Sequence, residues 1–167
     1  MSNKQRVLLH KIYVRHSGID VADLLPLTLI RRCIWKTLYY EGAKFPCEVS
    51  VLITDDDGIR KINRRFRGVD SSTDVLSFPM QEFSPPGWNT EQIEGIDPET
   101  GVVPLGDIIL SFERTDVQAR ENGHTRELEA SYLIVHSVMH LLGYDHMDEA
   151  EEKRQMRDRE KEIMQKL

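Results

Sequence analysis

The chain has 167 residues, of which 40% are hydrophobic and 30% charged, and its formal net charge is −6. This composition excludes a disordered chain and a fibre, and no apolar run approaches the roughly 20 residues that a membrane-spanning helix needs. We expect a single domain over residues 1–167. The acidic balance argues against nucleic-acid binding through the whole surface, although it permits a local basic face.

The two cysteines, Cys33 and Cys47, bear on the cellular compartment. We interpret them as free buried thiols rather than a disulfide, as is usual where the environment is reducing. Residues 1–6 contain no apolar core of a signal peptide. A cytoplasmic location is therefore the default expectation.

The first half of the chain alternates predicted strands and helices. Residues 6–15 and 49–54 have the alternation of strands, and the run from Pro26 to Tyr40 is predicted to be a helix with Pro26 in its first turn and Gly42 as its stop.

An acidic triplet, Asp55–Asp57, then opens a short helix, because carboxylates cap the free N–H groups of a helix start. Its predicted buried stripe is Ile59, Ile62 and Phe66, and Gly68 ends it.

Two further strands are predicted at 74–78 and 105–112, on either side of a segment rich in proline and glycine. An irregular segment as long as 81–104 is often a lid or a binding loop in a compact domain. A disordered insertion is the alternative, and the sequence does not decide between them.

Helices are predicted over 113–121 and from the cap at Thr125 to a break at Gly143. The second is expected to bury Leu128, Tyr132, Val135, Met139 and Leu142.

The C-terminal helix is expected to be a solvated surface helix without chemistry. Asp148 and Glu151 resemble a capping box, and Glu149 can pair with Lys153. Its apolar stripe is thin and consists of Met156, Ile163 and Leu167. Taken together, the elements predict an α+β fold, with a central mixed β-sheet of about four strands packed by helices and a metal site at the end of a helix.

Three histidines form the main chemical signal. His136 and His140 are four residues apart and share one helix face, so two imidazoles can bind one metal ion. Gly143 permits a turn that returns His146 to the same ion. Three imidazoles with an open fourth position describe a catalytic zinc site, whereas a structural site needs a fourth ligand. Asp145 is a candidate acceptor for orienting the imidazoles.

The same spacing occurs in metzincin proteases, which have a glutamate base directly after the first histidine. Here that position is Ser137, and a hydroxyl of ordinary pKa is a poor base at neutral pH. This residue disfavours a peptidase.

The helix that ends at Gly68 is strongly basic. It carries Arg60, Lys61, Arg64, Arg65 and Arg67. These cations either form an ordinary solvated face or bind an RNA backbone. Arg67 stands at the helix end, where its guanidinium can clamp a phosphate or stabilise transition-state charge.

Three segments resemble the YbeY family of rRNA maturation endoribonucleases. They are residues 66–79 (FRGVDSSTDVLSFP), 105–110 (LGDIIL) and 136–146 (HSVMHLLGYDH), in the order of the family. Ser137 and Met139 depart from the usual glycine and leucine, but neither is a ligand.

The resemblance implies a zinc-bound α+β fold with one Zn²⁺, and single-strand-specific cleavage of RNA in maturing the 3′ end of small-subunit rRNA. It implies His136, His140 and His146 as metal ligands and Arg67 as the functional arginine. Arg60, Lys61, Arg64 and Arg65 are weaker candidates for substrate binding, on the basic run of the helix alone. Implied partners are the small ribosomal subunit, its proteins and an Era-type GTPase. Neither DNA nor a membrane is expected.

On this hypothesis, zinc lowers the pKa of a bound water or acts as a Lewis acid in phosphodiester cleavage, and Arg67 stabilises the added negative charge. The nucleophile is either water or the 2′-hydroxyl of the RNA. Two alternatives stay open: another zinc hydrolase, such as a peptidase, and a non-catalytic ribosome-assembly factor with a structural zinc.

Overall fold

A four-stranded mixed sheet forms the centre of the fold in the computed structural model, which describes residues 8–20, 24–145 and 150–167. Its strand order is β1 (Lys11–Ser17), β2 (Cys47–Thr54), β4 (Val103–Ser111) and β3 (Val75–Pro79). The first three are parallel, and β3 pairs antiparallel with β4 at one edge. The predicted α+β fold with a mixed sheet of about four strands is confirmed.

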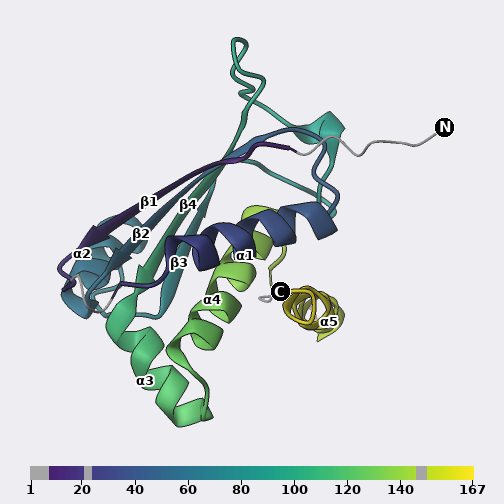
Figure 1. The fold of residues 1–167 in the computed structure, drawn as a ribbon. Helices are drawn as coiled ribbons and strands as arrows, with labels where there is room; N and C mark the ends of the chain where they lie inside the picture. Colours follow the sequence, from purple (N-terminus) through teal and green to yellow (C-terminus); the bar gives the residue numbers. More distant parts are fainter. Residues whose placement is uncertain (1–7, 21–23, 146–149) are drawn as a thin grey trace.

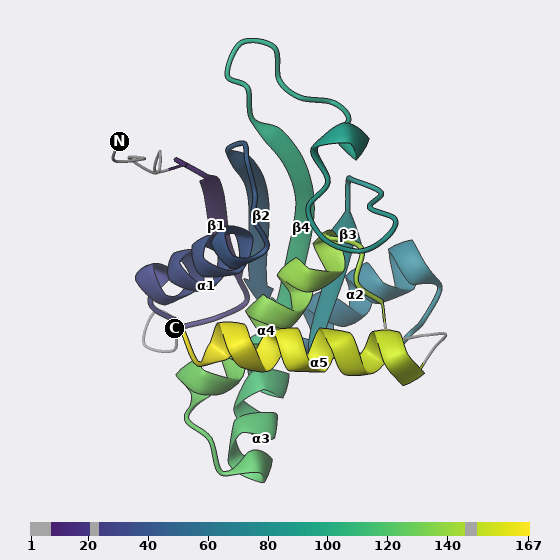
Figure 2. The same cartoon turned by 90° about the vertical axis from the view of Figure 1, so that its right-hand side faces the viewer.

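Helices cover both faces of this sheet. One face packs against α1 (Leu27–Tyr40) and α4 (Arg126–Leu141), and α5 (Ala150–Met164) lies across α4 (Figures 1 and 2). The other face packs against α2 (Asp56–Arg67). The fifth helix, α3 (Phe112–Asn122), joins β4 to α4. Within the described ranges, no helix is long and apolar enough to cross a bilayer.

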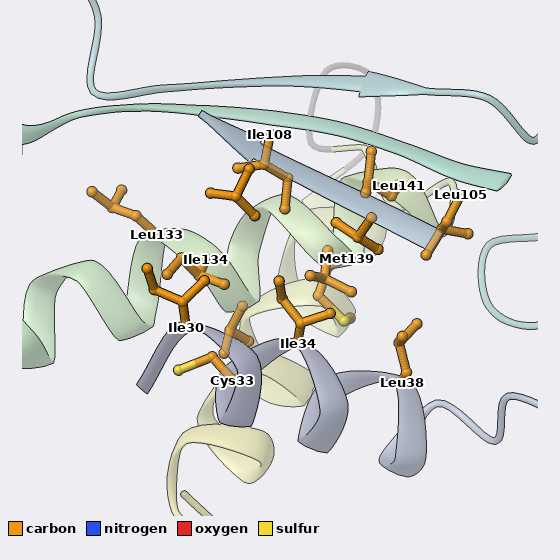
Figure 3. Packing of buried hydrophobic residues seen from close by; sticks show 14 of the residues in the cluster. Ile30, Cys33, Ile34, Leu38, Leu105, Ile108, Leu133, Ile134, Met139 and Leu141 are labelled. Atoms are coloured by element: carbon orange, nitrogen blue, oxygen red, sulfur yellow. The ribbon is translucent and has the colours of Figure 1, made fainter. Parts of the chain in front are cut away.

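The main core lies between the sheet and the α1–α4 layer. Alternate residues of β2 and β4 point into it, because side chains alternate along a strand. Figure 3 shows α1 and α4 closing over β4. The labelled side chains are Ile30, Cys33, Ile34, Leu38, Leu105, Ile108, Leu133, Ile134, Met139 and Leu141, all of them buried. Cys33 and Cys47 are buried and free, as predicted, and burial raises the pKa of the Cys47 thiol to about 12.

A smaller core lies between α2 and the opposite face of the sheet. It contains Ile59, Leu76 and Ile109, with Ile62 partly buried at its margin. The prediction that Phe66 is buried is wrong, because its side chain is 62% exposed. Phe66 lies at the end of α2, where its ring meets Phe78 of the edge strand edge-on, with centroids 5.5 Å apart.

Two predictions about α4 and α5 need correction. Leu128 and Tyr132 of α4 are 44% and 41% exposed. The side of α4 that packs against the sheet, α1 and α5 instead includes Ile134 and Val138. The predicted stripe of α5 is buried at Met156 and Ile163. That stripe docks α5 on the rest of the protein, so α5 is not merely a solvated helix.

Polar caps set several helix boundaries where the sequence predicts them. The carboxylate of Asp55 accepts the Gly58 N–H at 2.7 Å, and the Thr125 hydroxyl accepts the Leu128 N–H at 3.2 Å. Pro26 is the residue before α1 rather than part of its first turn. Asp148 of the predicted capping box and Glu149 of the predicted pair with Lys153 lie outside the described residues.

The long segment 81–104 is tied to the body of the protein. Phe83 is buried in the main core, and the Gln81 side chain donates to the carbonyl of Pro104 at 2.8 Å and to that of Glu94 at 3.0 Å. A single 3-10 turn, η2 (Thr90–Gln92), interrupts it. These contacts argue against a disordered insertion.

Candidate metal centre and arginine

The last turns of α4 bring two histidines together. The Nε2 atoms of His136 and His140 are 3.0 Å apart, and the ring planes are nearly perpendicular, at 85°. This follows from their spacing of four residues, which places both side chains on one helix face.

Each imidazole is held from behind through its other nitrogen. Nδ1 of His136 lies 2.5 Å from Oε1 of Glu160, and Nδ1 of His140 lies 2.6 Å from the carbonyl oxygen of Tyr144. A carbonyl oxygen can only accept, so Nδ1 of His140 carries a proton and donates it. At His136, a carboxylate oxygen beside Nδ1 likewise favours the tautomer with its proton on Nδ1. In neutral rings, the two Nε2 atoms then present lone pairs to each other.

Two lone pairs at that separation repel unless a proton or a metal cation lies between them. Nitrogens bound to one tetrahedral zinc at about 2.0–2.1 Å would be about 3.3 Å apart, which is close to the geometry of this pair. Donation from Nδ1 to an acceptor is also the usual arrangement behind a metal-bound imidazole. His136 and His140 therefore have the geometry to hold a divalent cation.

The third predicted ligand, His146, lies outside the described residues. Among the residues that are described, no group of three or more histidine, cysteine, aspartate or glutamate side chains forms a metal cluster. The assignment of all three ligands therefore stays a prediction.

Glu160 is a site residue that sequence analysis missed. Its side chain is almost fully buried where α5 crosses α4, and its Oε2 accepts the Tyr132 hydroxyl at 3.3 Å. Burial, followed by the charge of Glu160, raises the pKa of Tyr132. The two acceptors at Nδ1 of His136 and His140 are thus Glu160 and the Tyr144 carbonyl, and a role for Asp145 in orienting an imidazole stays a prediction. The expectation that α5 carries no chemistry is wrong, since the Glu160 carboxylate orients His136.

The turn after α4 has no room for a side chain at Gly143. Gly143 adopts a positive φ of 86°, and a β-carbon there would lie 2.5 Å from the carbonyl oxygen of Phe83. The Gly87 N–H donates to the Leu142 carbonyl at 2.9 Å. The segment 81–104 is therefore anchored beside the histidine pair, as a binding loop would be.

Ser137 is completely buried, on the core side of α4. The position that holds the glutamate base in metzincins is therefore occupied by a buried hydroxyl, which does not favour the peptidase alternative.

Arg67 lies at the C-terminal end of α2, next to Gly68, whose φ is 71°. Its Nη2 donates to the carbonyl of Ser77 at 3.1 Å, and its guanidinium lies 5.6 Å from the centre of the Phe78 ring. Both contacts are with the edge strand β3, which α4 also contacts from the other face. Within the described part of the chain, Arg67 contacts β3 and α4 contacts β3, so this strand is the element that connects the two regions.

The other cations of α2 are partly neutralised. Arg60 pairs with Asp70 at 2.8 Å, and Lys61 pairs with Asp57 at 2.6 Å. Arg65 lies over the ring of Phe66 at 5.3 Å. The basic run that the sequence predicts is therefore weaker as a phosphate-binding surface than its composition indicates.

The fold and these residues can be compared with known proteins. The sequence model of the family described as Endoribonuclease YbeY matches residues 15–167. The solution structure of TM1509 from Thermotoga maritima is similar, with a TM-score of 0.58, 25% identity, and coverage of 92% of this chain and 87% of that one.

Curated relatives are similar over nearly their whole length. The Endoribonuclease YbeY of Clostridium acetobutylicum is 47% identical over 160 residues, covering 92% of this chain and 95% of the relative. That of Caldanaerobacter subterraneus is 44% identical over 153 residues, covering 92% and 93%. These matches define an enzyme of the nuclease class that acts on RNA. The chain belongs to the YbeY family of endoribonucleases.

Proposed function

We propose that the protein is a zinc-dependent, single-strand-specific endoribonuclease that matures the 3′ end of small-subunit rRNA. The observation that carries the metal part is the inward-facing Nε2 pair of His136 and His140, each imidazole held through Nδ1 by an acceptor. His146 would complete the ligand set. When bound, zinc would supply Lewis acidity and lower the pKa of a coordinated water.

The residues of the chain have separate roles in this scheme. Glu160 and the Tyr144 carbonyl fix the tautomers of the histidines. Arg67 binds a phosphate oxygen and stabilises the negative charge that develops during phosphodiester cleavage. Its exposed position at a helix end lets an extended RNA strand reach it.

The cellular setting is part of the same proposal. The net charge of −6 and the ion-paired cations of α2 favour help with RNA affinity from a partner. The small ribosomal subunit, its proteins and an Era-type GTPase would fill this role. The two free cysteines agree with a reducing, cytoplasmic location.

The test is cleavage of a 5′-labelled single-stranded RNA and of the same RNA in a duplex. We expect the wild type to cut only the single strand, chelation to stop cutting, and added zinc to restore it. His140→Ala should stay inactive with zinc, whereas His124→Ala, a control outside the pair, should cut normally. Equal cutting by His140→Ala would attribute the activity to a contaminant and overturn the proposal.

Product ends then identify the nucleophile. Attack by the 2′-hydroxyl of the RNA leaves a 2′,3′-cyclic phosphate, whereas attack by water does not. Finding the cyclic phosphate would exclude the hydrolytic route.

A further inference from the structure

A second surface combines basic and aromatic side chains on α1. This helix contains no acidic residue between Leu27 and Tyr40. Its inner face is buried, and residues four apart share a side of a helix. The remaining face carries two parallel rows, Arg31–Trp35–Tyr39 and Arg32–Lys36–Tyr40. The first row has one cation followed by two aromatic rings, and the second has two cations followed by one aromatic ring.

A cavity of about 990 Å³ lies beside this face. Its lining includes Trp35, Lys36 and Tyr39 of α1, and Lys44 and Phe45 from the turn before β2. No aspartate or glutamate is among the described residues that line it. The cavity lies at the C-terminal half of α1, beside the segments that lead into β1, β2 and β4.

The aromatic rings are arranged as a platform. Trp35 and Tyr39 stack with their centroids 5.2 Å apart and their planes within 11° of parallel. Nζ of Lys36 is 5.8 Å from the centre of the Tyr40 ring. Tyr39 is 42% exposed, so a planar group can reach it from solvent. Nucleobases stack on such rings regardless of base identity.

The cations of α1 differ from those of α2. Arg60 and Lys61 of α2 are paired with aspartates. In the described part of the chain, no ion pair joins Arg31, Arg32 or Lys36 to an acid. In a protein of net charge −6, an unneutralised basic surface with aromatic rings matches the charge and stacking of single-stranded nucleic acid.

We propose that this α1 face, defined as Arg31, Arg32, Trp35, Lys36, Tyr39 and Lys44, binds a segment of single-stranded RNA apart from the histidine pair. Bases stack on Trp35 and Tyr39, and the lysines and arginines contact phosphates. The choice of RNA rests on the proposed function. The surface would hold substrate that extends beyond the cleavage site.

The test measures equilibrium binding of a fluorescent single-stranded RNA by anisotropy at several salt concentrations, with the RNA checked for integrity afterwards. Tyr39→Ala removes half of the platform and should weaken binding roughly five- to hundredfold. Lys36→Gln with Lys44→Gln should lower the slope of log affinity against log salt by about 1.4, since each lost phosphate contact on a single strand changes it by about 0.7.

Matched controls lie on other surfaces. Tyr13→Ala removes an exposed tyrosine of β1, and Lys153→Gln with Lys161→Gln removes two exposed lysines of α5. Both should bind RNA like the wild type, and circular dichroism checks that every variant is folded.

The proposal is overturned if the α1 variants bind with wild-type affinity and salt slope, which would leave a protein partner as the ligand of this face. It is also overturned if the controls weaken binding equally, or if the wild type binds no RNA. Cleavage is assayed separately. A wild type that binds through α1 but never cuts would refute the proposed function and leave this inference standing.

Discussion

The histidine pair and Arg67 differ in how the fold holds them. His136 and His140 lie on a central helix, and each ring is fixed by an acceptor at Nδ1. Arg67 lies at an exposed helix end and is held by one carbonyl and one aromatic face of the edge strand. The first arrangement is preorganised, as metal ligation requires, and the second leaves a long side chain able to follow a phosphate.

The largest expected effect on activity comes from removing one imidazole of the histidine pair. His136→Ala should reduce RNA cleavage roughly 10³-fold or more, because a catalytic metal contributes several kcal/mol to transition-state stabilisation. The measurement is the rate of cleavage at saturating RNA, with zinc added. Retention of more than a tenth of the wild-type rate would contradict the role of the pair.

The second largest effect on activity is expected from the loss of the Arg67 guanidinium. Arg67→Ala should lower the cleavage rate roughly 10²–10³-fold, as loss of a donor to transition-state charge does, without changing the metal content. Arg67→Lys should recover only part of the rate, since lysine lacks the planar fork. Arg64→Ala, an exposed neighbour on the same helix, is the control. Similar rates for Arg67→Ala and Arg64→Ala would reduce Arg67 to an ordinary surface cation.

A smaller effect, on zinc affinity, is expected from changing Glu160, which orients His136 without being a ligand itself. Glu160→Gln keeps the shape and an acceptor oxygen but removes the charge behind His136, so zinc affinity should fall roughly 10–100-fold. Competition with a chromophoric chelator measures this affinity. Glu162→Gln, on the exposed side of α5, should not change it. If both variants bind zinc alike, Glu160 only helps to dock α5.

The smallest effect concerns stability outside both regions. His10 accepts the Cys47 N–H at Nδ1 (3.0 Å), and burial lowers its pKa from 6.5 to about 4. Below pH 6.5 the unfolded chain takes up the proton first, so this contribution to stability is present above 6.5 and lost as the pH falls towards 4.

His10→Gln keeps an acceptor without titrating in that range. In urea unfolding, the wild type should lose on the order of 1–2 kcal/mol more than His10→Gln between pH 7 and pH 4. Parallel pH profiles for the two proteins would show that His10 does not titrate as described.

Local signals in the sequence predicted local structure well. Asp55 and Thr125 cap their helices, and Gly68 ends α2, because each effect depends on neighbouring residues alone. The spacing of His136 and His140 likewise predicted their meeting on one helix face.

Features that depend on tertiary packing could not be predicted from the sequence. Phe66 continues the periodicity of α2 but lies at the sheet edge, where little surface covers it. Glu160 stands among other charged residues, 24 positions after His136, and only the docking of α5 across α4 buries it beside the imidazole. The pairing of Arg60 with Asp70 across the end of α2 was also not visible in the composition of the helix.

The central claim is that the histidine pair holds a metal ion rather than a shared proton. Native mass spectrometry of zinc-loaded protein tests it most directly, on the wild type, Arg67→Ala and His140→Ala. We predict one zinc per chain in the wild type and in Arg67→Ala, and none in His140→Ala. A wild type without zinc, or a His140→Ala variant that holds as much zinc as the wild type, would contradict the account.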